Sequence, residues 1–316
     1  MGVFVFLPLV LPLTAWPIAR LAEQHLHPRT ATRLLTAVAG VMAVCSTLCL
    51  ALLMVVGTAQ LPGNPLPDGW SDPEVRAAVP YDEVAGKVAI PALLAVCAAC
   101  ARTLWRHARV RRRARRALEG LRGNSVAVLT DEASYAYALP TRAGGRVVVT
   151  TGMLSRLASA ERRALFAHER AHLSARHHRH LIVTQLAARA NPFLQPLRTS
   201  VAYAAERWAD EAAAGAVRDR RAVARAIGKA AMASRGVPAP TLAGLAGLAG
   251  LASPGPVPRR VAALLAPAPS ARTRPSVFTA VGLALWSAAV GTAVSAMSSA
   301  NSAVTMVLIL RAATPL

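Results

Sequence analysis

Long stretches without a charged side chain constrain this sequence more than any other feature. Residues 34–60 contain no Lys, Arg, Asp or Glu, and about 20 apolar residues are enough for a helix to cross a bilayer. Charged residues make up only 16% of the chain and its mean hydropathy is +0.39, as expected of a membrane protein. We therefore predict about four transmembrane helices, at about 2–19, 34–60, 84–105 and 276–297.

The net charge of +21 is concentrated in one part of the chain. Residues 106–274 contain 29 of the 36 Lys and Arg residues and 9 of the 15 Asp and Glu residues, whereas residues 61–83 are acidic. Because basic segments beside membrane spans stay in the cytoplasm, we expect 61–83 to be an outer loop and 106–274 a cytosolic domain. The spans of 1–105 precede this domain, and 275–316 hold the fourth span and a short tail.

This basic excess allows two interpretations. It is of the size that nucleic-acid-binding proteins carry. The densest run, residues 106–116, directly follows a predicted span, where basic residues contact anionic lipid. We therefore expect contact with membrane lipid, and no specific nucleic acid partner.

One motif in the cytosolic domain indicates chemistry. His168, Glu169 and His172 form the pattern H-E-x-x-H. On a helix, positions i and i+4 share a face, so the two imidazoles can bind one metal ion while Glu169 reaches a metal-bound water as general base. We predict that helix from Ala160 to at least Arg176, with Ser159 as its N-cap. The alternative is a surface helix that merely carries two histidines.

A third metal ligand is expected from a second helix, over residues 200–217. Glu206 and Asp210 share a face of that helix. A catalytic zinc takes three protein ligands and keeps one position open, which His168, His172 and Glu206 would satisfy. Asp210, one turn further on, is placed to accept the other N–H of a ligating imidazole. The alternative is that these acids form surface salt bridges.

The rest of the domain predicts an α+β fold. Short β-branched or aromatic runs at 125–130, 133–139 and 146–150 are separated by turn-forming residues, which indicates a small sheet. His177, His178 and His180 follow the motif; they are either further metal ligands or, as we favour, a solvated basic helix end.

Together, these residues resemble the membrane zinc peptidases. The resemblance covers about residues 124–266 and rests on H-E-x-x-H at 168–172 and on Glu206-x-x-Ala209-Asp210, with weaker similarity around 138–154, 222–229 and 259–261. The group includes the HtpX-type proteases, the CAAX prenyl proteases and the BlaR/MecR-type antirepressor peptidases.

This resemblance implies a gluzincin-like fold, a small sheet plus active-site helices, with one Zn²⁺ per chain. It implies His168, His172 and Glu206 as zinc ligands and Glu169 as base. It also implies that the strand with Ala136, Tyr137 and Ala138 binds the substrate as an added strand. The expected location is a bacterial cytoplasmic membrane, with the peptidase domain in the cytoplasm.

The function predicted from the sequence is a membrane-anchored zinc metalloendopeptidase that hydrolyses peptide bonds of protein substrates. A cytosolic transcriptional repressor is one expected substrate. The oxyanion needs a donor, for which Tyr203 and the nearby arginines are candidates. The alternative function is a non-catalytic membrane receptor or scaffold whose basic domain binds an acidic partner or DNA.

Overall fold

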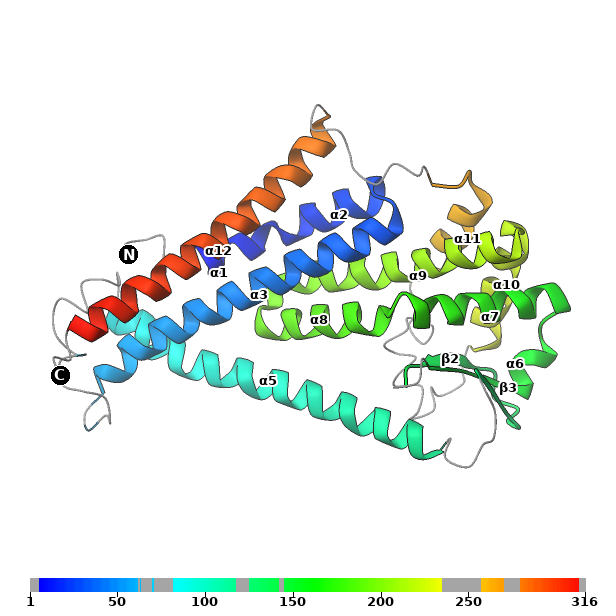
Figure 1. Cartoon of the computed structure of the whole chain (residues 1–316), viewed down its shortest axis with the longest axis horizontal. Helices are drawn as coiled ribbons and strands as arrows, with labels where there is room; N and C mark the ends of the chain where they lie inside the picture. The colour runs from blue at the N-terminus through cyan, green and yellow to red at the C-terminus, as the bar shows by residue number, and fades with distance from the viewer. Residues whose placement is uncertain are drawn as a thin grey trace.

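The computed structural model describes residues 6–61, 63, 70, 82–117, 125–141, 145–234, 257–269 and 279–312. Most of the predicted acidic outer loop lies outside these residues, as do the last four residues of the tail. Within the described part, long apolar helices extend to one end of the molecule, and a small sheet with shorter helices forms the other end (Figure 1).

Three helices of the described part are long and apolar enough to cross a membrane. Within them the candidate spans are Pro28–Ala59, Val84–Arg116 and Gly282–Ala312. A helix suits lipid because every interior backbone N–H and C=O group is paired within the segment. The helices are α3 (Pro28–Ala59), α5 (Asp82–Ala117) and α12 (Ala280–Ala312).

The span predicted at 2–19 is not among them, so the count of four is not confirmed. From residue 6 onward this segment is divided into α1 (Leu7–Val10), the 3₁₀ helix η2 (Leu11–Thr14) and α2 (Ala15–His25). Pro8 and Pro12 are the second residues of the first two pieces. Each proline lacks the N–H that a continuous helix would use, which accounts for the change in helix type.

The last membrane helix extends beyond the span predicted at 276–297. It continues to Ala312, so Ser298, Ser299 and Asn301 lie inside it rather than at its end. Hydroxyl side chains are tolerated in such a helix because they can bond to a carbonyl one turn earlier. Thr292 does this, donating to the carbonyl of Ala288 at 2.8 Å.

The predicted small sheet is confirmed, with strand order β1-β3-β2. The central strand β3 pairs in parallel with β1 and antiparallel with β2, so β2 is an edge strand. Tyr137 and Leu139 pack with Ala114 of α5, whereas Ala136 packs with Leu165 on the opposite face. The strands are β1 (Val126–Leu129), β2 (Ala136–Leu139) and β3 (Arg146–Thr150).

Most of the remaining helices surround the predicted motif. The helix with the H-E-x-x-H motif begins at Ser159 instead of after it, because Glu161 accepts the Ala158 N–H at 2.8 Å and caps the helix one residue earlier than predicted. It ends at Ser174, and Arg176 then has φ of 53°. The helices are α6 (Thr151–Ser155), α7 (Ser159–Ser174), α8 (His177–Ala190), η4 (Pro192–Leu194), α9 (Gln195–Val217), α10 (Arg220–Ala233) and α11 (Val257–Leu265).

The membrane helices and the shorter helices share one apolar core. Leu35 and Ala39 of α3 belong to the same buried cluster as Ala187 of α8 and Leu197 and Val201 of α9. The helix α5 continues across the boundary drawn at residue 105 and reaches the sheet. The metal-motif helices are therefore packed on the membrane helices rather than joined to them by a linker.

The crossing of α3 and α5 provides a test of this packing. A Cβ added to Gly57 would lie 2.2 Å from the backbone carbonyl carbon of Gly86, which is far inside contact distance. We expect Gly57→Ala to force the helices apart and to destabilise the protein by about 1–3 kcal/mol. Gly291→Ala on α12 is the matched control, because a Cβ there meets nothing within 4 Å. Melting temperatures in detergent should fall for Gly57→Ala alone, and equal values would contradict this packing.

Candidate metal centre

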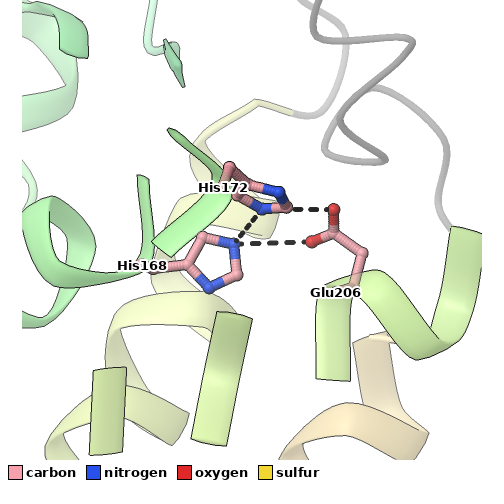
Figure 2. Close-up of side chains that lie close together, drawn as sticks. All are labelled: His168, His172 and Glu206. Carbon is pink, nitrogen blue, oxygen red and sulfur yellow. Dashed lines mark hydrogen bonds and ion pairs between the residues drawn. The ribbon is translucent and has the colours of Figure 1, made fainter. Parts of the chain in front are cut away.

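Two helices bring three potential metal ligands together. His168 and His172 lie one turn apart on α7, and Glu206 approaches from α9 (Figure 2). The Nε2 atoms of the two histidines are 3.1 Å apart; Oε2 of Glu206 lies 3.4 Å from Nε2 of His168, and Oε1 lies 3.4 Å from Nε2 of His172. All three side chains are buried.

These separations fit one zinc ion. Ligand bonds of 2.0–2.1 Å at a tetrahedral centre place neighbouring ligand atoms about 3.3 Å apart. The N–N distance of 3.1 Å and the distance of 3.4 Å from each histidine nitrogen to the carboxylate oxygen that faces it are close to that value, and one ligand atom from each residue lies within 4.8 Å of the other two. Two imidazoles and one carboxylate are also a donor set that zinc takes in hydrolytic sites, with a fourth position left for water.

Asp210 lies where the sequence placed it, one turn after Glu206. Its Oδ1 is 3.0 Å from Nδ1 of His168, the ring nitrogen that faces away from the cluster. A carboxylate at this point fixes the orientation of the imidazole and makes the opposite nitrogen a better donor to a metal. Because Asp210 is fully buried, its charge needs compensation.

Arg260 of α11 provides that compensation. Its Nε and NH2 groups donate to the two carboxylate oxygens of Asp210 at 2.8 and 2.6 Å, and NH1 lies 3.0 Å from Oε2 of Glu206. Burial would raise the pKa of the Asp210 carboxyl, but the charge and hydrogen bonds of Arg260 bring that pKa below its ordinary value.

Sequence reasoning did not assign Arg260 to the site. It lies 50 residues beyond Asp210, and the only signal was the weak similarity around 259–261.

Glu169 is buried and has no well-formed hydrogen bond within the described part of the chain. Its side chain is 0% exposed, and neither carboxylate oxygen has a hydrogen-bond partner of good geometry in the described part of the chain. Burial raises its pKa to about 7. The backbone of Ala138, in the edge strand β2, lowers this pKa, so Ala138 lies near the carboxyl group. A carboxyl group with a pKa near neutrality suits proton transfer.

The interpretation of the three following histidines as a solvated helix end is wrong for His177. This residue is 1% exposed, and its Nδ1 lies 2.9 Å from Nδ1 of His172. His178 and His180 are half-buried, and among the described residues the ligand cluster contains neither. The sequence signal was available, since His177 follows His172 by five residues, but the turn at Arg176 that aims it inward is not visible in the pattern.

Tyr203 lies on α9, one turn before Glu206. Its ring packs under the Arg259 guanidinium, whose central carbon is 4.6 Å from the ring centroid. This contact places the Tyr203 ring against α11. The role of Tyr203 as oxyanion donor stays a prediction.

The donor set and the apolar helices are compatible with a membrane-associated metallopeptidase. Comparison with protein families agrees: residues 100–188 match the family model described as Peptidase family M48, which confirms the resemblance to membrane zinc peptidases. The matched segment contains the sheet and α7, with His168, Glu169 and His172, but it ends before Glu206. Comparison with curated proteins and with solved structures gave no match.

Two adjacent arginines test the buried ion pairs. Arg260→Met leaves Asp210 and Glu206 without a buried countercharge, and breaking such a pair costs about 3–5 kcal/mol. Arg259→Met is the matched control, because the Arg259 side chain is 51% exposed and its pair with Glu23 is worth about 0–1 kcal/mol. Denaturant unfolding in detergent should show the larger loss for Arg260→Met. Equal stability of the two variants would contradict the role given to Arg260.

Proposed function

We propose that this chain is a membrane-anchored zinc metalloendopeptidase that hydrolyses peptide bonds of protein substrates at the cytoplasmic face of a bacterial membrane. The observation that supports this most is the spacing of the His168, His172 and Glu206 ligand atoms at 3.1–3.4 Å, one residue from the buried Glu169. A scaffold without catalysis has no need for a carboxyl group buried at that position.

In this proposal His168, His172 and Glu206 would hold one zinc ion, which would supply Lewis-acid chemistry for peptide hydrolysis. Glu169 accepts the proton of that water and passes it to the leaving amine. Burial of Glu169 favours its protonated form, so the carboxyl group is suited to hold the proton between these two steps. Asp210 fixes the His168 ring, and Arg260 keeps both acids ionised.

The substrate is proposed to bind along β2 as an added strand. Ala136, Tyr137 and Ala138 belong to this edge strand, and the backbone of Ala138 acts on Glu169. Backbone hydrogen bonds to a free strand edge align an extended peptide without requiring a particular sequence. Such binding suits an endopeptidase that acts on protein substrates. A cytosolic transcriptional repressor is one proposed substrate.

The orientation in the membrane follows from charge. The Arg-rich end of α5 packs on the sheet, at the end of the molecule that carries the metal motif (Figure 1). Basic segments beside spans remain on the cytoplasmic side. We therefore propose that residues 106–274 form the cytosolic peptidase domain, flanked by the membrane-spanning parts 1–105 and 275–316.

Replacing the proposed base tests catalysis without removing the metal site. We expect Glu169→Gln to retain zinc and to lose at least about 100-fold of the peptidase activity, because Gln cannot accept the proton of the water. Glu132→Gln, at an exposed position before β2, is the control and should be fully active. The assay is cleavage of an unfolded model protein by purified full-length chain in detergent. Undiminished activity of Glu169→Gln would rule out the mechanism and favour the scaffold alternative.

The ligand assignment has its own test. We expect wild-type protein to contain one zinc per chain by elemental analysis and His168→Ala to contain almost none, since two ligands do not hold a catalytic zinc firmly. His178→Ala, half-buried on α8 and outside the cluster, should keep its zinc. Stoichiometric zinc in His168→Ala would mean that the metal is bound elsewhere.

A further inference from the structure

We infer that His177 is a positioning residue for the metal ligand His172, and that Trp208 holds His177 in place. This inference rests on the proposed function, because it concerns the ligand set of the same site. It adds a residue outside the ligand cluster and outside the H-E-x-x-H motif.

His172 and His177 contact each other through their Nδ1 atoms, which do not face the ligand cluster. Nε2 of His172 faces the Nε2 of His168 and the Glu206 carboxylate, so its Nδ1 is the outward atom. That Nδ1 lies 2.9 Å from Nδ1 of His177, with the ring planes at 83°. The distance is that of an N–H···N hydrogen bond, and one of the two atoms must carry the proton.

The role of His172 as a metal ligand determines whether the shared proton is on Nδ1 of His172 or on Nδ1 of His177. A ligating imidazole needs the lone pair of Nε2, so the proton of neutral His172 is on Nδ1 and this N–H donates to His177. His177 then accepts at Nδ1 and carries its own proton on Nε2. In this arrangement His177 fixes both the tautomer and the ring angle of His172.

The two imidazole ligands therefore have different supports. Asp210, a charged carboxylate, contacts His168, whereas a neutral imidazole contacts His172. His177 itself does not face the cluster, because its Nδ1 points at the far side of the His172 ring. It is therefore a support for a ligand and not a fourth ligand.

Trp208 keeps the His177 ring in position. The two ring centroids are 4.7 Å apart at an interplanar angle of 61°, an edge-on arrangement. Arg29 and Arg33 of α3 place their guanidinium carbons 5.7 and 5.5 Å from the centroid of the Trp208 ring. Contacts thus lead from a membrane helix through Trp208 and His177 to His172.

The test compares two substitutions of His177, by Asn and by Gln, whose amide side chains differ in length by one methylene group. In His177→Asn the side-chain amide oxygen can occupy roughly the place of Nδ1 and accept from His172, whereas the longer side chain of His177→Gln places its amide near the position of Nε2. Zinc affinity of the full-length protein in detergent is measured by competition with a chelator. We expect His177→Asn to bind within about threefold of wild type and His177→Gln to bind about 10–100-fold more weakly.

His178→Gln is the matched control, because His178 is adjacent, half-buried and outside the cluster; its zinc affinity should equal that of wild type. If His177→Gln does not fold, His177→Phe takes its place, since it keeps an aromatic ring against Trp208 but has no acceptor. Wild-type affinity in the variant without an acceptor would overturn the inference. An equal loss in His177→Asn would also overturn it, because packing alone would then account for the effect. Failure of the wild type to bind zinc would instead overturn the proposed function.

Discussion

The burial of several ionisable groups at one point is the constraint on which this structure depends. His168, Glu169, Glu206 and Asp210 are all nearly inaccessible, and an uncompensated buried charge costs more than a single packing contact can offset. Arg260 meets this constraint by bonding to Asp210 and Glu206 together. The helices α7, α9 and α11 are consequently held by polar contacts at the centre and by apolar contacts around it.

This site cannot be separated from the membrane helices. The apolar core that supports α8 and α9 includes residues of α2 and α3. A buried polar contact crosses the same boundary, since the Asn191 amide donates to the Ser46 hydroxyl of α3 at 3.1 Å. The rigidity that a ligand set requires is supplied here in part by α3, a helix long and apolar enough to cross a bilayer.

Local sequence patterns were sufficient to predict the helix faces that carry the site residues and the small sheet, because both depend on local backbone geometry. The i and i+4 spacing within α7 and within α9 is a property of any helix, so the faces carrying His168, His172, Glu206 and Asp210 could be predicted from the sequence. The small sheet followed from β-branched runs and turns. The distant partners could not be predicted, because neither the left-handed turn at Arg176 nor the approach of Arg260 leaves a periodic pattern. The first span was not confirmed, because an uncharged run shows its own length but not whether one helix continues through its prolines.

The helix α11 shows how remote parts of the chain complete the site. It has nine residues, too few for a helix to be stable on its own. Arg220 of α10 donates to the carbonyls of Ala263 and Leu264, and Leu264 is buried in the cluster with α10. Its two successive arginines then point to different partners: Arg259 to Glu23 of α2 and Arg260 to the metal-site acids. Since Glu23 also accepts from Ser200 of α9, the N-terminal segment, α9 and α11 are joined at one carboxylate. The exposed pair between Arg259 and Glu23 thus adds one contact between α11 and the segment that precedes the first long membrane helix, while Arg260 keeps the charge balance of the site.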